Sequence, residues 1–382
     1  MADFFFTIHS DIILSSYSSS NIGTYTKNQG SRFILLADPI VKQMGLLSKM
    51  TDSLNANNVN FFIYDSIEYN ADTKTLEQVL NLSHNAHIDG VIAVGGSKVL
   101  NLGRAISSLY NEVQYMYNFI DGAKPKEKPL PLIIVPTTMR DNFSFAECTP
   151  IVDSRSNKLK IMLNQGPLCS VAIFDPTLTR TLTQNQIFAM SLESLCLAAE
   201  TYLSSKANFF TEMISCKAIE LIGMSLETED NKKVTTSKEE LLGQGGAIAS
   251  LASGISSIGA ATLLSLCINT KYEISSYLTS SILFPYAMED AAQFKKTKIA
   301  KIARILGLDN GLKSEDELVS ELITYLRNKL GAAGLPTRLK DLGLSLPQLS
   351  AAAEDAAELD LVSKLPRSMT AEDLFGLIKK AY

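Results

Sequence analysis

The sequence predicts an α/β N-terminal, Rossmann-like domain with a parallel sheet, followed by an all-α C-terminal domain. Strand-like and helix-like segments alternate as far as about residue 177, and strand signals nearly vanish after it. The 382 residues are enough for two separate cores. We therefore expect domains at residues 1–177 and 178–382. Alternating β-α-β-α order implies right-handed crossovers and ligands at the C-terminal ends of the strands.

In the first half, four apolar runs predict strands, at residues 33–37, 59–64, 90–94 and 130–135. Helical periodicity lies between them at 41–55 and 73–86. The first strand ends at Asp38-Pro39, and the third runs directly into Gly95-Gly96.

In the second half, long helical patterns follow one another, at residues 184–204, 209–226, 238–268, 274–284, 297–306, 315–332, 347–359 and 371–381. The polar run 228–237 predicts a solvated connection between helices. Residues 243–270 carry no charge, which would also fit a membrane span, but the stretch is crowded with Gly and Ser. A helix buried on every side explains it at least as well, so we expect no membrane.

The composition excludes some classes of partner. A hydrophobic fraction of 46% with 20% charged residues is typical of a globular protein, and the net charge of −5 gives no general attraction to nucleic acid or anionic lipid. Five scattered cysteines without a CxxC pair indicate reduced thiols and a cytoplasmic location. The N-terminus lacks the basic region of a signal peptide. A homo-oligomer is left open.

A glycine-rich turn follows the third predicted strand, at Gly95-Gly96-Ser97. Glycines at a strand-to-helix turn let backbone N–H groups approach a pyrophosphate, and the helix N-terminus adds a favourable dipole. Two adjacent glycines alone are explained equally well by ordinary turn chemistry.

Further motifs decide how this turn is interpreted. The loop GGSKVLNLGRAI at residues 95–106 is followed, in order, by PTT at 136–138, FDPTLTRTL at 174–182, SLESLCLAAETY at 191–202, GLPTRLKDLG at 334–343 and PRSMTAED at 366–373. Together they resemble motifs of the iron-containing alcohol dehydrogenase family, in particular its glycerol dehydrogenase-like branch. The resemblance covers nearly the whole chain.

The resemblance implies an NAD(H)-dependent alcohol or polyol oxidoreductase with a small-molecule ligand in a cleft between the domains. It implies cofactor-binding roles for Asp38, Gly95, Gly96, Ser97, Asn101, Thr137, Thr138 and Lys160. A carboxylate at Asp38 would accept hydrogen bonds from the ribose 2′-OH and repel a 2′-phosphate, which favours NAD over NADP. The alternatives are a helix N-cap for Asp38 and a solvated lysine for Lys160.

The chain departs from the family pattern around the expected nicotinamide site. In the loop, Ser97, Asn101 and Arg104 replace a glycine, an acid and a lysine. After PTT, the family's small AGTGSE becomes MRDNFS at residues 139–144, which adds bulk. Arg140 in this segment could bind an anion bidentately or be a solvated surface arginine.

The expected metal site departs further. The family holds Fe or Zn with one Asp and three His, and by resemblance these fall on Glu193, Leu197, Thr262 and Ser276. The chain has only three histidines, at 9, 84 and 87. One carboxylate, two hydroxyls and a leucine offer one strong ligand, so we predict no metal here. Cys196 and Cys267, which could in principle help, are expected to be core packing.

Two functions stay open at this point. The first is an oxidoreductase that works without metal, with Lys271, Tyr272 or Tyr277 as proton donor; simple packing at helix ends is the alternative for both tyrosines. The second is a catalytically silent relative that binds a dinucleotide or another anion, or serves a structural or partner role. The sequence does not identify the substrate.

Overall fold

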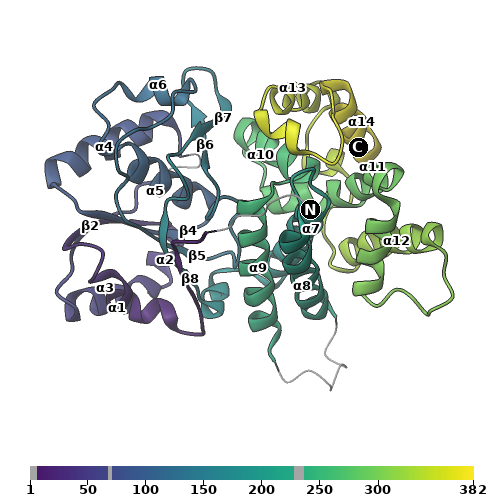
Figure 1. Cartoon of the computed structure of the whole chain (residues 1–382), viewed down its shortest axis with the longest axis horizontal. Coiled ribbons are helices and arrows are strands. Elements are labelled where there is room, and N and C mark those ends of the chain that lie inside the picture. The colour runs from purple at the N-terminus through teal and green to yellow at the C-terminus, as the bar shows by residue number, and fades with distance from the viewer. Residues whose placement is uncertain (1–6, 68–70, 228–235) are drawn as a thin grey trace.

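The computed structural model describes residues 7–67, 71–227 and 236–382. An α/β half and a helical half lie side by side (Figure 1). The main sheet has the order β1-β8-β5-β4-β2-β3, and every neighbouring pair is parallel. Its strands are β1 Asp11–Leu14, β2 Arg32–Ala37, β3 Asn60–Tyr64, β4 Gly90–Gly95, β5 Leu132–Pro136 and β8 Cys169–Phe174. The predicted fold class is confirmed.

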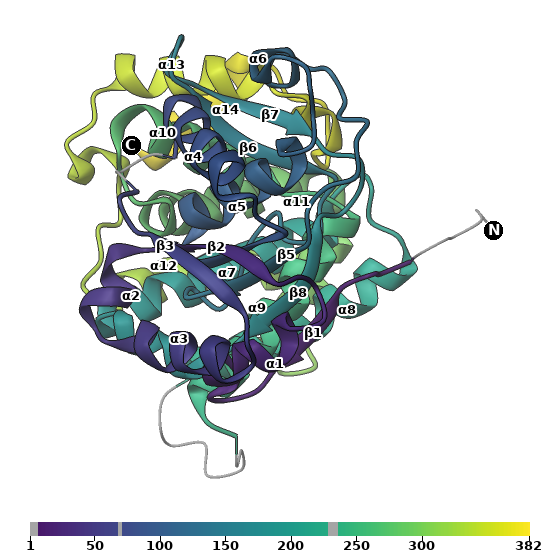
Figure 2. The same ribbon diagram turned by 90° about the vertical axis from the view of Figure 1, so that its left-hand side faces the viewer.

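Residue alternation along the central strands builds two cores, one on each face of the sheet. In β2, Phe33 and Leu35 pack into one buried cluster, whereas Ile34 and Leu36 pack into the other. All four are fully buried, as expected for a parallel strand covered on both faces. The covering helices are α1 Ile22–Thr26, α2 Pro39–Gln43, α3 Leu46–Ala56, α4 Thr73–Ala86, α5 Ser97–Leu109 and α6 Met116–Ile120 (Figure 2).

The sequence did not predict four of the strands. Two of them, β1 and β8, complete one edge of the main sheet. The other two, β6 Cys148–Asp153 and β7 Lys158–Leu163, form a separate antiparallel hairpin. The hairpin extends toward the helical half, where Lys158 forms ion pairs with Asp355 and Glu358.

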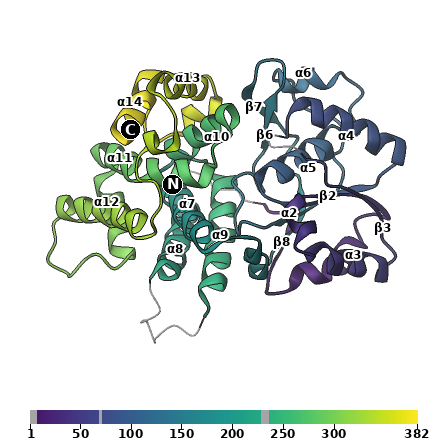
Figure 3. The same cartoon turned by 180° about the vertical axis from the view of Figure 1, so that it is seen from behind.

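The helical half contains α7 Gln184–Leu203, α8 Phe209–Leu226, α9 Lys238–Ile255, α10 Ala260–Tyr272, α11 Ser276–Ile305, α12 Glu315–Ala332, α13 Leu346–Ala357 and α14 Ala371–Ala381 (Figure 3). Four short 3-10 helices complete the structure: η1 Ser18–Asn21, η2 Pro176–Thr181, η3 Leu339–Leu342 and η4 Asp360–Lys364.

One of the predicted helix assignments was wrong, and another had its boundary in the wrong place. The predicted helix 238–268 is two helices, α9 and α10, because the chain turns at residues 256–259. The predicted helices 274–284 and 297–306 both lie within α11, in which Lys295 forms a kink between two helical parts, and the first part continues past residue 284. Most of the predicted connection 228–237 lies outside the described residues.

The charge-free stretch is explained by close packing of α9 against the loop after β5. A Cβ on Gly246 would lie 2.3 Å from the carbonyl oxygen of Met139, and one on Gly254 would lie 2.6 Å from the backbone of Phe145. Glycine is needed because two backbones approach each other there. Among the described residues, no single helix is long and apolar enough to span a membrane, and α9 and α10 meet the criterion only as a pair bent by 93°.

Replacing these glycines tests the contact. We expect Gly246→Ala and Gly254→Ala each to lower the free energy of unfolding by about 1–3 kcal/mol, because the added methyl group forces the backbones apart. Gly376→Ala in α14 is the matched control, since no atom lies within 4 Å of its Cβ position. It should be neutral or stabilise by up to about 1 kcal/mol. Urea unfolding measures all three, and wild-type stability in both α9 variants would contradict the contact.

Candidate functional site

The glycine turn lies at the C-terminal end of β4, in the middle of the sheet. Gly95 has a φ of +156°, and a Cβ there would lie 2.9 Å from both the Cβ of Asp38 and a methyl group of Val99. Gly96 is the N-cap of α5 and supplies no side-chain cap, and a Cβ there would meet no atom within 4 Å. The turn therefore packs tightly on one side and is open on the other.

Three of the predicted cofactor positions meet at this edge of the sheet. The Asp38 backbone N–H donates to the carbonyl of Val94 at 2.9 Å, and the Thr137 N–H donates to the carbonyl of Gly95 at 3.1 Å. These bonds bring the ends of β2, β4 and β5 together, as expected for a parallel sheet.

Asp38 occupies the N-cap position of α2, but its side chain makes no capping hydrogen bond. Asp38 therefore lies where the N-cap alternative expects it, but its carboxylate does not cap the helix. Within the described ranges, no hydrogen bond or ion pair engages that carboxylate, and its role toward a ribose stays a prediction.

The other predicted cofactor residues lie in three places. Ser97 is the first residue of α5, and Asn101, one turn later, accepts a hydrogen bond from Arg104. Thr138 donates to the carbonyl of Arg140 at 2.9 Å. Lys160 lies half-buried on the separate β7 strand. Asn101 and Thr138 thus help to hold local structure.

The four positions that correspond by resemblance to metal ligands lie on three helices. Glu193 and Leu197 are one turn apart on α7, Thr262 lies on α10, and Ser276 begins α11. Glu193, Leu197 and Thr262 are each at most 4% exposed. The Ser276 hydroxyl donates to Oε1 of Glu193 at 3.2 Å.

A guanidinium group, from Arg140, engages the other oxygen of Glu193. Arg140 Nη2 forms an ion pair with Glu193 Oε2, and Nη1 donates to Oδ1 of Asn142 at 2.9 Å. The arginine is only 3% exposed, so the surface alternative was wrong. The anion that Arg140 binds is the Glu193 carboxylate of the same chain, and this pair joins the loop after β5 to helix α7.

A second buried arginine anchors the same loop. Arg104, which is 1% exposed, contacts Asp141 from Nη1 at 2.6 Å, and the Ser144 hydroxyl donates to the same carboxylate at 2.7 Å. Burial alone would raise the pKa of Asp141, but attraction to Arg104 and these hydrogen bonds outweigh burial and lower the pKa. Ser250 of α9 accepts a hydrogen bond from the Asp141 N–H at 2.9 Å.

These contacts decide whether the residues present fit a divalent metal ion. Glu193 is the one carboxylate of the four positions, and it is already paired with a cation. Leu197 has no donor atom, and Thr262 and Ser276 offer neutral hydroxyls. The described part of the chain holds no group of three or more His, Cys, Asp or Glu side chains arranged for a metal. The residues do not fit Fe²⁺ or Zn²⁺.

The cysteines do not change this conclusion. Cys196 and Cys267 are buried in the helical core. Burial raises the pKa of both thiols, which disfavours the thiolate that a metal requires.

Two of the three candidate proton donors are engaged elsewhere. Lys271 forms an ion pair with Asp355 of α13, and the Tyr272 hydroxyl donates to the carbonyl of Gln348 at 2.7 Å. Burial also raises the pKa of Tyr272, which makes it a weaker acid. Both residues tie α10 to α13, which favours the structural alternative for them. Tyr277 is the second residue of α11, directly after Ser276.

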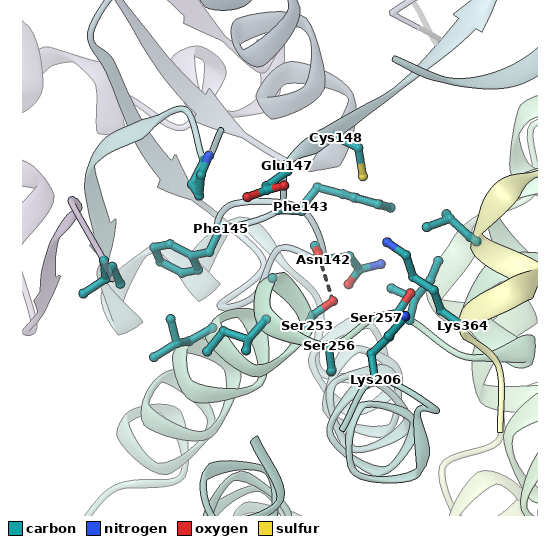
Figure 4. A pocket seen from close by; sticks show the side chains of 18 of the residues that line it. Asn142, Phe143, Phe145, Glu147, Cys148, Lys206, Ser253, Ser256, Ser257 and Lys364 are labelled. Atoms are coloured by element: carbon teal, nitrogen blue, oxygen red, sulfur yellow. Dashed lines mark hydrogen bonds between the residues drawn. The ribbon is translucent and has the colours of Figure 1, made fainter. Parts of the chain in front are cut away.

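A cavity of about 720 Å³ lies between the two halves. The α/β half contributes residues 7–10, 142–143, 145–148, 163 and 167, and the helical half contributes residues 206, 251, 253–258, 361 and 364 (Figure 4). None of the residues predicted to bind cofactor or metal lines it. Sequence reasoning expected a ligand between the domains and noted the altered segment that contains Asn142 and Phe143, but it did not identify the other lining residues, because they come from distant segments with no shared motif.

The parallel sheet with its glycine turn, followed by a helical half, is typical of dinucleotide-binding α/β proteins. The iron-containing alcohol dehydrogenase family model matches residues 10–176, and the model of the C-terminal part of the Fe-containing alcohol dehydrogenase family matches residues 187–382. The chain belongs to this family.

The relatives are distant but span the chain. Lactaldehyde reductase of Escherichia coli is 24% identical and covers 91% of both chains. Long-chain-alcohol dehydrogenase 1 of Geobacillus thermodenitrificans is 25% identical, covering 93% of this chain and 91% of its own. The crystal structure of a 1,3-propanediol oxidoreductase superposes with a TM-score of 0.90 at 20% identity over 100% of each chain. The structure of NADH-dependent butanol dehydrogenase A from Thermotoga maritima gives 0.83 at 18% identity, covering 99% of this chain and 98% of its own.

The lowered pKa of Asp141 predicts a component of acid sensitivity. A carboxyl group with a pKa lower in the folded state than its unfolded value of about 3.9 stabilises the fold above that value, and this stabilisation is lost as the pH falls toward the folded pKa. Asp141→Asn should flatten the fall in stability below about pH 5. The exposed Asp52→Asn is the control. Denaturant unfolding from pH 7 to pH 2 tests this, and an unchanged slope in Asp141→Asn would contradict it.

The Arg140–Glu193 pair predicts strong non-additivity. Arg140→Met or Glu193→Met should each cost about 3–5 kcal/mol of unfolding free energy, because each leaves a buried group without its partner. Arg140→Met combined with Glu193→Met should cost clearly less than the sum of the two single changes. A double-mutant cycle measured by chemical unfolding gives the coupling energy, and additive effects would show that the pair is not coupled.

Proposed function

We propose that this chain is a metal-free member of the family that binds NAD(H) and lacks the family's metal-dependent alcohol dehydrogenase activity. The observation that carries the proposal is the buried ion pair between Arg140 and Glu193. It places a permanent organic cation on Glu193, the one carboxylate among the four positions that correspond to metal ligands.

Electrostatics supports the metal-free state. An arginine guanidinium stays protonated at any accessible pH, so Arg140 cannot make room by losing its charge. A divalent ion beside Glu193 would be repelled by that guanidinium within a region of low dielectric, where like charges interact strongly. A guanidinium can donate hydrogen bonds, but it has no vacant coordination position for a substrate oxygen and so supplies no Lewis acid.

The features around the glycine turn support binding of the dinucleotide. The open space above Gly96, the uncapped first turn of α5 and the unengaged carboxylate of Asp38 lie at one edge of the sheet. Backbone N–H groups there suit a pyrophosphate, and the carboxylate suits a ribose diol. One structural neighbour is described as NADH-dependent.

A metal-independent oxidoreductase is the other candidate, and no contact favours it. It needs an acid beside the reacting carbonyl. Lys271 and Tyr272 are held by α13, which leaves Tyr277 as its remaining candidate.

A titration with NADH tests the binding half of the proposal. We expect saturable enhancement of NADH fluorescence by the full chain, and at least a tenfold weaker affinity in Asp38→Ala, about 1.4 kcal/mol, because the ribose loses its acceptor. Asp52→Ala, an exposed carboxylate on α3, is the matched control. No binding by the wild-type protein would reject this half.

Metal analysis and turnover assays test the other half. Protein purified without chelator should contain far less than one equivalent of zinc or iron, and NADH with a panel of aldehydes should give no turnover with or without added Zn²⁺ or Fe²⁺. Stoichiometric metal, or turnover that depends on it, would overturn the proposal. Turnover without metal that disappears in Tyr277→Phe would favour the metal-independent oxidoreductase.

A further inference from the structure

The interdomain cavity has the size of a small-molecule site. Its volume of about 720 Å³ lies within the range of roughly 300–1,000 Å³ that is usual for ligand pockets. Among the described residues, the lining includes two lysines, Lys206 and Lys364, and one carboxylate, that of Glu147. In a chain with a net charge of −5, this is a local excess of positive charge.

The two lysines are held close together by the backbone. Lys206 lies in the turn after α7, and Lys364 is the last residue of η4. The Ser204 hydroxyl and the Ser205 N–H both donate to the carbonyl of Lys364, each at 3.1 Å. Figure 4 shows both lysine side chains on the same side of the cavity. The fold therefore places two ammonium groups beside one space.

Neither ammonium group has a partner within the ranges that the structure describes. Lysines nearby behave differently: Lys271 is paired with Asp355, and Lys298 is paired with Glu212 at 2.8 Å. Glu147 forms no ion pair with Lys206 or Lys364 in the described structure, although all three line the cavity. Two like charges held beside each other without a counterion favour binding of an anion.

Uncharged hydrogen-bond donors add to the lysines. Ser257 is 4% exposed, and its hydroxyl oxygen is buried without a partner among the described residues. An unpartnered buried hydroxyl is costly and is expected to meet a ligand or water. Asn142 also lines the cavity, and because its Oδ1 accepts from Arg140, its NH₂ group remains to donate. The available groups are thus mostly donors, which suits an acceptor-rich ligand.

The rest of the wall is apolar. Phe143, Phe145, Leu251, Ile258 and Leu361 line the cavity as well. We propose that this cavity binds a small organic anion, with its phosphate or carboxylate group held by Lys206, Lys364 and Ser257 and its carbon chain lying along the apolar wall. The inference goes beyond dinucleotide binding and does not require it.

Calorimetry with the full chain tests the site. The probes are glycerol 3-phosphate, glycerate, inorganic phosphate and glycerol. We expect one of the two organic anions to bind, inorganic phosphate to bind more weakly because it lacks the carbon chain, and glycerol to show no binding because it lacks the charge. Comparison of glycerol 3-phosphate with glycerate distinguishes a phosphate ligand from a carboxylate ligand.

Variants locate the bound anion. Lys206→Gln and Lys364→Gln should each weaken binding at least tenfold, and Ser257→Ala should weaken it several-fold. Lys49→Gln removes an exposed charge on α3 and is the matched control. Thermal unfolding verifies that each variant is folded. Absence of binding by every anion at millimolar concentration, or affinity unchanged in both lysine variants, would overturn the inference.

The outcome is separable from that of the dinucleotide proposal. Asp38→Ala should leave the affinity for the organic anion unchanged, and saturating NADH should not displace the anion. Loss of anion binding in Asp38→Ala would place the anion at the glycine turn and reject the cavity site. Failure of NADH to bind while the anion still binds would reject only the proposed function.

Discussion

The buried ion pair between Arg140 and Glu193 is the interaction on which the rest of the site depends. It links the loop after β5 directly to helix α7, and it is a buried link between the two halves of the chain, whereas the ion pairs of Lys158 join them nearer the surface. Two buried charges are tolerated only when each satisfies the other and its remaining hydrogen bonds are made. The Ser276 hydroxyl donates a hydrogen bond to the second oxygen of Glu193. Asn142 accepts one from Arg140, whose Nε has no partner among the described residues.

The loop from residue 139 to 145, which carries Arg140, is itself held in place by contacts with helices α5 and α9. Arg104 fixes it from α5 through Asp141, and glycines of α9 let it pack against a helix backbone. Met139 adopts a φ of +59°, which is uncommon for a side chain of its size, and it is fully buried. The large side chains of residues 139–144 thus fill space between the halves. The two buried arginines and the glycines of α9 hold this same loop in place.

The sequence predicted those features of the structure that depend on neighbouring residues, and it did not predict those that depend on residues far apart in the chain. The alternation of β2, β4 and β5 with helices is local and strong, and it gave the fold class. Strands β6 and β7 were missed because polar and charged residues interrupt them, and the break between α9 and α10 was missed because Ser256–Gly259 continues an apolar, small-residue composition. The histidine count showed which ligands were absent. It could not show that a guanidinium had taken the carboxylate, since Arg140 and Glu193 are 53 positions apart and only the fold brings them together.

The ion pair also explains why charge matters in the neighbouring cavity. Glu193 and Arg140 neutralise each other, so neither residue offers a free charge to a ligand. The unpaired positive charge is instead at Lys206 and Lys364, next to Asn142, which the same arginine orients. A ligand held there would be recognised by its own negative charge and not by coordination to a metal. Attraction between fixed ammonium groups and an anion requires no coordination chemistry, so recognition at the proposed anion site does not depend on a metal beside Glu193.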